Sequence, residues 1–123
     1  MADVTFEITS YSYLLYTQGD HYLVWDGNLL KVRAAISCQG SEYTTTILVL
    51  ADDSYLPADQ FDEASRQVFM FARPVQFPWF IDMLRNEKPI YCRAANYPPA
   101  MMGYCYLTTT YEPIGELERL LSK

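Results

Sequence analysis

Alternating apolar and polar residues predict strands in the first half of the chain. Over residues 4–9, Val4, Phe6 and Ile8 alternate with polar residues, which is typical of a strand with one buried face. Residues 30–36 alternate in the same way, residues 43–50 are rich in β-branched residues, and residues 11–17 and 22–25 are also expected to be strands. Turn residues separate these segments: Gln18-Gly19-Asp20, Asp26-Gly27-Asn28 and Gln39-Gly40-Ser41. We therefore expect an antiparallel meander in which the segments 11–17 and 22–25 form the first hairpin.

After residue 76, the spacing of apolar residues changes from the period of two of a strand to the period of a helix. Phe77, Phe80, Ile81 and Leu84 recur at positions i, i+3, i+4 and i+7, which places an apolar stripe along one helical face. Pro78 suits a first helical turn, and Pro89 disfavours continuation beyond the residues before it. The pattern predicts a helix from Pro78 to Asn86 that covers the sheet through this stripe.

Three further strands and one loop complete the prediction. Residues 66–72 are apolar on both faces, which indicates a strand covered on both sides. Residues 90–95 and 101–111 follow the helix as strands, and leucines near the end of the chain predict a short helical turn at Leu117–Leu121. The acidic segment 51–64 is expected to be a long surface loop, with a helical turn near residues 57–61.

This order of elements predicts one domain, residues 1–123, of the α+β or mostly-β class. The expected architecture is an antiparallel, barrel-like sheet with one main helix near residues 78–86. An OB-like barrel has a helix in this position between its strands, although the segment 66–72 is one strand too many for its simplest form. A curved antiparallel sheet with a helix packed on it is the alternative.

Composition and charge limit the classes of protein to which this chain can belong. Half of the residues are hydrophobic and a fifth are charged, so an ordered chain is expected. The formal net charge is −6, which disfavours non-specific nucleic-acid binding.

Three widely spaced cysteines argue against a disulfide framework. The first residues lack the basic and apolar regions of a signal peptide, and no apolar run approaches the roughly 18 residues of a membrane span. We expect a cytoplasmic protein with no membrane association.

Little in the sequence indicates catalysis, a metal site or a cofactor. His21 is the one histidine, which excludes a multi-histidine metal site. The acidic loop lacks the alternating ligands of known calcium loops, and no glycine-rich phosphate loop is present. Cys92 and Cys105 are in phase with apolar neighbours, so they are predicted to pack in the core. Cys38 is the candidate reactive thiol, and a pair of His21 with Cys38 or Cys105 is the alternative catalytic arrangement.

Aromatic residues provide the strongest functional signal. Rings and one guanidinium are expected on sheet faces, and they are the candidate binding residues: Tyr11, Tyr13, Tyr91, Arg93, Tyr104 and Tyr106. Tyrosine is favoured at protein interfaces because it combines an apolar body with a polar tip. We therefore predict a non-catalytic binding protein that contacts a protein partner or its own copy through an aromatic sheet face.

Two other functions remain open at this point. Rings and bases on one face would also suit stacking of single-stranded nucleic acid on an OB-like barrel, with the bases supplied by Lys31, Arg33, Arg66, Arg73 and Arg93. A small enzyme with a reactive cysteine is the third hypothesis.

Two segments resemble a pattern in small uncharacterised bacterial proteins. They are Leu84-Arg85-Asn86-Glu87-Lys88-Pro89-Ile90-Tyr91 and Glu112-Pro113-Ile114-Gly115-Glu116. The resemblance covers the last third of the chain and consists mostly of residues that end helices and strands. It implies a bacterial cytoplasmic protein and carries no information about its activity.

Overall fold

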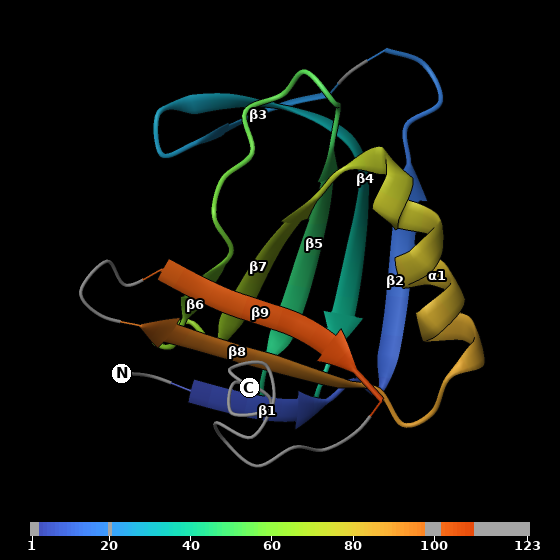
Figure 1. Ribbon diagram of the computed structural model, residues 1–123, viewed down its shortest axis with the longest axis vertical. Helices are drawn as coiled ribbons and strands as arrows, with labels where there is room; N and C mark the ends of the chain where they lie inside the picture. The colour runs from blue at the N-terminus through green and yellow to red at the C-terminus, as the bar shows by residue number, and fades with distance from the viewer. Residues whose placement is uncertain (1–2, 20, 98–101, 110–123) are drawn as a thin grey trace, which may run out of the picture.

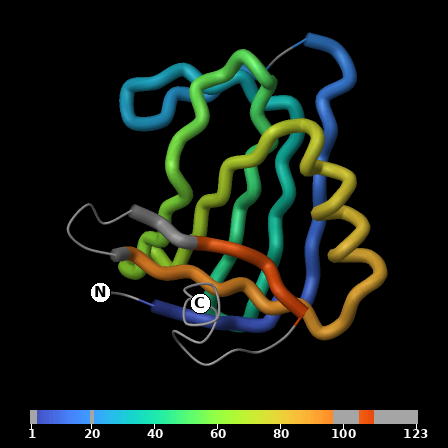
Figure 2. Tube along the Cα trace, viewed as in Figure 1, coloured from blue at the N-terminus to red at the C-terminus, as the bar shows by residue number. Residues whose placement is uncertain are grey.

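The computed structural model describes residues 3–19, 21–97 and 102–109 (Figures 1 and 2). For Tyr97 and for residues 102–104, it describes the backbone alone. The predicted C-terminal turn at Leu117–Leu121 lies outside the described residues. Within them, the order of elements is β1 (Asp3–Glu7), β2 (Ser10–Leu15), β3 (His21–Trp25), β4 (Asn28–Gln39), β5 (Thr44–Leu50), β6 (Gln60–Asp62), β7 (Gln67–Ala72), η1 (Pro74–Gln76), α1 (Phe77–Asn86), β8 (Tyr91–Tyr97) and β9 (Met102–Thr108).

The strands form two sheets. The smaller sheet has the order β1-β8-β9 and is antiparallel throughout. The larger has the order β2-β4-β5-β7-β6, and β3 pairs with the first half of β4. The three strands of the smaller sheet cross in front of the lower part of the larger one (Figure 1). The predicted mostly-β, α+β class is confirmed, whereas the sheets are not closed into a barrel, so the OB-like arrangement is not confirmed.

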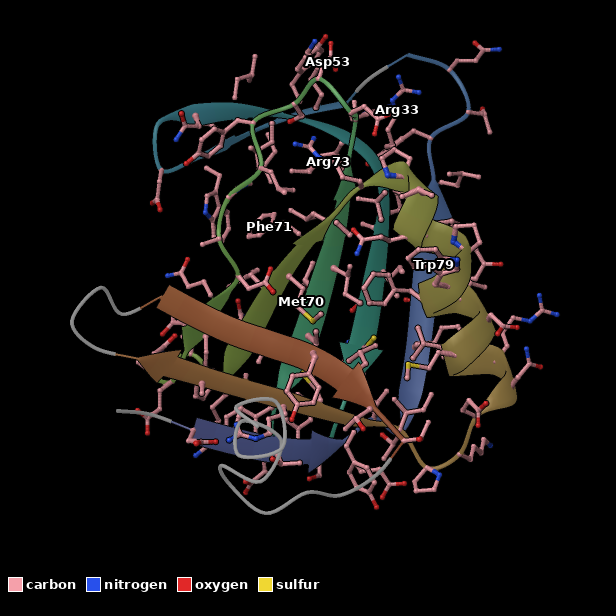
Figure 3. All side chains as sticks on the ribbon, in the orientation of Figure 1. Arg33, Asp53, Met70, Phe71, Arg73 and Trp79 are labelled. Carbon is pink, nitrogen blue, oxygen red and sulfur yellow. The ribbon has the colours of Figure 1, made fainter. Side chains whose placement is uncertain are left out.

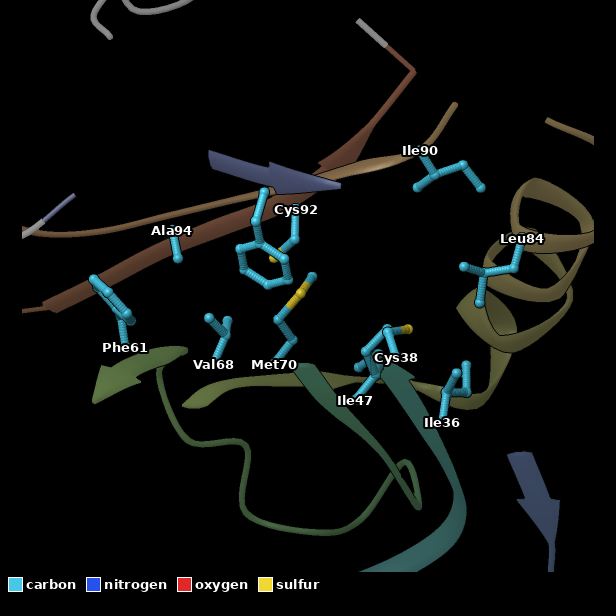
Figure 4. Close-up of a cluster of buried hydrophobic side chains, with 12 residues drawn as sticks. Ile36, Cys38, Ile47, Phe61, Val68, Met70, Leu84, Ile90, Cys92 and Ala94 are labelled. Atoms are coloured by element: carbon cyan, nitrogen blue, oxygen red, sulfur yellow. The ribbon is translucent and has the colours of Figure 1, made fainter. Parts of the chain in front are cut away.

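The main core fills the space between the two sheets and α1 (Figure 4). Apolar residues of β4, β5 and β7 meet those of β1 and β8 there, because successive side chains of a strand point to opposite faces. Its buried members are Phe6, Ile36, Cys38, Ile47, Phe61, Val68, Met70, Ala72, Leu84, Ile90, Cys92 and Ala94. Gly40 allows the close approach of β1 to this core, since a Cβ there would lie 2.7 Å from Cδ2 of Phe6.

The predicted helix is confirmed as α1. Leu84 is buried, and Phe77, Phe80 and Ile81 pack half-buried against the main core, so the apolar stripe faces inward as expected. Proline occupies the first turn, where a missing N–H removes no helical hydrogen bond. In Figure 1, α1 lies beside β2, and the ring of Phe77 makes an edge contact with Tyr13 at a centroid distance of 5.9 Å.

The prediction of an antiparallel sheet is wrong at β5 and β7, which pair in parallel from Thr44↔Gln67 to Val49↔Ala72. Parallel neighbours require a long crossover, and the acidic segment 51–64 provides it. This segment contains β6, antiparallel to β7, where a helical turn was expected. Side-chain alternation has the same period in both directions, so it carries no information about strand direction.

The first predicted hairpin is also wrong. The segments 11–17 and 22–25 do not pair with each other; β2 and β3 instead pair with successive parts of one edge of β4. The actual hairpin joins β3 to β4 at Asp26-Gly27, where both residues have positive φ (48° and 79°). This backbone matches the tight turns favoured by Asp-Gly, so the predicted turn at these residues is confirmed.

A second, smaller core lies on the other face of the larger sheet. The register of β4 against β5 shifts between Val32 and Ala34, an irregularity that increases local bending. Leu30, Val32 and Leu50 are buried together, and Trp25 makes edge contacts with Phe69 and Phe71 at 5.0 and 5.1 Å between ring centroids. The β3–β4 hairpin thus covers this face of β7, which confirms that the segment 66–72 is covered on both sides.

Candidate functional site

The predicted aromatic residues lie on two different sheets. Tyr11 and Tyr13 are in β2, and Tyr13 is 51% exposed, whereas Tyr11 packs against the main core. Tyr91 and Tyr106 are half-buried in β8 and β9 of the smaller sheet. The backbone of Tyr104 is in β9, and its side chain lies outside the described ones. The predicted group is therefore divided between two sheets.

Arg93 is buried rather than surface-exposed. Its side chain is 1% exposed and its Nη1 donates a hydrogen bond of 2.8 Å to Oδ1 of Asp3, whose side chain is 10% exposed. A buried charge is retained where it is paired and hydrogen-bonded, so this arginine joins β8 to β1. Alternation alone places Arg93 away from the main core and does not reveal that this face is covered.

The basic residues expected to line one face have separate structural contacts. Lys31 Nζ lies 2.7 Å from Oδ2 of Asp53. Arg73 Nη1 donates to the backbone oxygens of Ala51 and Ser54, at 2.6 and 2.9 Å. Two of the five bases therefore anchor the start of the acidic loop, and Figure 3 shows Arg73 beneath Asp53 in this region.

The thiols are poorly suited to nucleophilic chemistry. Burial raises the pKa of both Cys38 and Cys92 to about 12, and burial also raises the pKa of Cys105 above its usual range. A thiolate is the reactive form, so the prediction of Cys38 as a reactive thiol is not supported by its environment. His21 pairs with Val32 on β4, six residues from Cys38 and on the order of 20 Å away along the strand, so these two residues do not form a pair.

An apolar surface covers the outside of the β3–β4 hairpin. Val24 and Leu29 are direct cross-strand partners, and Tyr22 follows two residues away on the same face. Their side chains are 67%, 56% and 59% exposed, respectively. We call these three residues the hairpin surface. The opposite face of the hairpin carries Leu30 and Trp25 into the second core, so the hairpin is apolar on both faces.

The edge of β3 that does not face β4 is unpaired within the described strands. Unpaired N–H and C=O groups on an apolar edge strand are a template for pairing with another strand. No lysine, arginine, aspartate or glutamate occurs in His21–Trp25, so the protection that lysine often gives to an edge strand is missing here.

A cleft of about 420 Å³ lies between β7, α1 and β9. Apolar and aromatic side chains dominate its lining, which includes one carboxylate: Asp59, Met70, Phe71, Gln76, Trp79, Phe80, Met83, Cys105, Tyr106 and Leu107. Met70 reaches this region from β7 and Trp79 from α1 (Figure 3), and Trp79 is 66% exposed.

Asp59 has an unusual environment for a carboxylate. Burial raises its pKa to about 6, although the backbone N–H of Phe71 donates a hydrogen bond of 3.0 Å to its Oδ1. A carboxyl group with a raised pKa in a cleft is a candidate functional group. Of the predicted residues, Tyr106 alone lines this cleft.

Within the described residues, no group of three histidine, cysteine, aspartate or glutamate side chains is arranged to hold a metal ion. In the same part of the chain, no helix combines the length and the apolar character that a membrane span requires. Comparison with protein-family models, curated proteins and solved structures finds no match.

Sequence reasoning missed both the hairpin surface and the Asp59 cleft. The signal for the hairpin surface is the run Tyr22-Leu23-Val24-Trp25, which is apolar without alternation although it borders a turn. An apolar run on an edge strand leaves one face or edge uncovered. No comparable signal marks Asp59, because the residues around it come from four separate segments of the chain.

Asp59→Asn is expected to stabilise the protein at neutral pH. Asp59 has a folded-state pKa raised from 3.8 to about 6, so its ionised form destabilises the folded state increasingly between these values and by a constant amount above them. Asparagine keeps the oxygen that accepts from Phe71. After discounting for solvent screening, the expected gain at about pH 7.5 is on the order of 1 kcal/mol.

Urea unfolding of both proteins at a series of pH values measures this effect. The advantage of Asp59→Asn should vanish as the pH falls below the unfolded pKa of 3.8, because Asp59 is then protonated in both the folded and the unfolded state. Asp52→Asn, at an exposed position in the same loop, is the matched control and should leave stability unchanged. Equal stability of Asp59→Asn and the parent protein at neutral pH would contradict a destabilising carboxylate.

Proposed function

We propose that the protein is a non-catalytic binding protein of a bacterial cytoplasm that associates with a second copy of itself. The hairpin surface, together with the adjacent edge of β3, is the contact. The observation that carries this proposal is the exposure of Tyr22, Val24 and Leu29, each more than half exposed, side by side on one hairpin. Contiguous exposed apolar side chains are characteristic of interaction sites, and exposing them costs solubility unless they are covered.

The charge distribution permits two copies to meet at the hairpin. The protein has a net charge of −6, so copies repel one another over most of their surface. The segment Tyr22–Trp25 has no ionic side chain, and the adjacent Lys31 is paired with Asp53. Two such hairpins can therefore meet without burying an unpaired charge. An edge strand can also pair with its own copy about a two-fold axis, because an isologous contact brings the same residues together from both sides.

The sequence-based prediction of a single aromatic sheet face is revised accordingly. Tyr22 is an aromatic member of the hairpin surface, whereas the residues first selected are divided between two sheets. Non-catalytic function is supported by the buried thiols, whose raised pKa values keep them protonated at neutral pH.

Val24→Asp is expected to abolish self-association. A charge at the centre of an apolar contact must be desolvated without a partner, which weakens association strongly. The matched control is Val75→Asp, because Val75 is 66% exposed, close to the 67% of Val24, and lies in η1 rather than on the hairpin. Sedimentation velocity over a range of protein concentrations should show a monomer–dimer equilibrium for the parent protein and Val75→Asp, and a monomer for Val24→Asp.

Two results would overturn the proposal. A parent protein that sediments as a monomer at all concentrations excludes self-association, and equal loss in both variants excludes the hairpin as the contact. Fluorescence anisotropy with a labelled mixed-sequence single strand tests the nucleic-acid alternative separately. Binding that falls steeply as salt rises would favour that alternative, because phosphate contacts release counterions.

A further inference from the structure

The Asp59 cleft is independent of the hairpin surface and has the features of a small-molecule site. Its volume of about 420 Å³ lies within the range of about 300–1,000 Å³ that is common for such sites. Such sites combine an apolar lining with a few polar groups that orient the ligand. Here β7, α1 and β9 provide the apolar lining, and the end of the acidic loop provides the carboxylate.

The polar groups of the cleft specify the charge of a ligand. No lysine or arginine occurs among the described residues that line it, and Asp59 is the one carboxylate. In the described part of the chain, the hydrogen bond from Phe71 N–H to Oδ1 is the recorded polar contact of Asp59. This neutral donor compensates only part of the carboxylate charge. A buried charge is stabilised most by a partner of opposite sign, so the cleft is complementary to a cation.

The rings of the cleft favour the same kind of ligand. The indole of Trp79 is 66% exposed, and Tyr106 lines the cleft from β9. A cation near the face of an aromatic ring is attracted by the ring's electron distribution, and tryptophan is the most effective ring for this contact. The thioether of Met83 and the ring of Phe80, both from α1, offer apolar contacts to the body of the ligand.

We propose that the cleft binds a small organic ammonium compound with an apolar body, with the ammonium group placed at the Asp59 carboxylate and the apolar body against Trp79 and Phe80. The carboxylate supplies a charge-assisted hydrogen bond, which is roughly twice as strong as a neutral one. The ionisation behaviour of Asp59 is consistent with this role, because an unpaired carboxylate in this cleft destabilises the folded protein and a bound cation removes that cost.

Calorimetric titration with three probes of similar shape tests the proposal. The probes are 2-phenylethylammonium, the neutral 2-phenylethanol and the anionic 3-phenylpropanoate. We expect the ammonium compound to bind at least about tenfold more tightly than the alcohol, which corresponds to one charge-assisted hydrogen bond, and the anion not to bind.

Three variants test whether the ligand binds in the Asp59 cleft. Asp59→Asn keeps the acceptor for Phe71 N–H, and it should weaken binding of the ammonium compound by at least about tenfold while leaving the alcohol unaffected. Asp53→Asn removes an exposed carboxylate outside the cleft and should leave both affinities unchanged. Trp79→Ala removes an exposed side chain without disturbing the core and should weaken the ammonium compound more than the alcohol.

Several outcomes would overturn the proposal. The proposal is wrong if the amine and the alcohol bind equally well. It is also wrong if Asp53→Asn weakens amine binding as much as Asp59→Asn does, or if the amine gives no heat of binding at millimolar concentration. The readout is separate from self-association, since monomeric Val24→Asp retains every residue that lines the cleft. Failure of one proposal is therefore distinguishable from failure of the other.

Discussion

Leu84→Ala is expected to lower the free energy of unfolding by about 2–5 kcal/mol. Leu84 is 5% exposed and is the buried residue of α1, where it packs into the main core (Figure 4). Truncation removes apolar surface from the core and leaves a cavity that rigid neighbouring strands fill only in part. Alanine favours the helix, so lost packing rather than helix propensity causes the destabilisation.

Leu15→Ala is the matched control for this prediction. It is the same substitution at a residue that is 56% exposed, in β2, and we expect a change within about 0.5 kcal/mol. Urea midpoints of the two variants and the parent protein provide the comparison. Similar midpoints for Leu84→Ala and Leu15→Ala would show that α1 contributes little to the core.

Asp3→Ala is expected to destabilise the protein by about 3–5 kcal/mol. The substitution removes the carboxylate that accepts a 2.8 Å hydrogen bond from Arg93, whose side chain is 1% exposed. The buried guanidinium loses this carboxylate in a site from which water is largely excluded, and the desolvation cost that the carboxylate offsets is the main part of the effect. Since the pair joins β1 to β8, the smaller sheet is the region most affected.

Asp53→Ala is the control because it also removes an aspartate paired with a base. The side chains of Asp53 and Lys31 are 70% and 33% exposed, so water screens their attraction, and the loss of stability should be much smaller than that for Asp3→Ala. Added salt should reduce the contribution of Asp53 further and have little effect on that of Asp3. Equal losses of stability in Asp3→Ala and Asp53→Ala would mean that burial does not determine how strongly the Arg93–Asp3 pair stabilises the protein.

The contrast between these two aspartates illustrates a limit of sequence reasoning. Asp3 and Asp53 both lie in segments rich in acidic or polar residues, and nothing in the local pattern distinguishes their environments. Burial of Arg93 depends on neighbours distant in the chain, beginning with Asp3, ninety residues earlier. The prediction of Arg93 as a surface binding residue assumed that the face opposite the core is open.

Local sequence patterns predict the structure correctly where the conformation depends on a single segment of the chain. The apolar stripe of α1, the turn at Asp26-Gly27 and the strand at residues 67–72 with two covered faces all follow from spacing within a few residues. In each case the backbone conformation is set by nearby residues, and the buried face is the apolar one because burial of apolar surface is the dominant favourable contribution to folding.

The tertiary structure alone decided strand partners, strand direction and the candidate sites. The residue types of β3 and β5 predict that both are strands, but pairing of β3 with β4 and parallel pairing of β5 with β7 depend on which edges meet. The hairpin surface exists because one face of the β3–β4 hairpin covers the second core and the other remains in solvent. Asp59 acquires its raised pKa only when β7, α1 and β9 surround it, since desolvation depends on neighbours in space and not on neighbours in sequence.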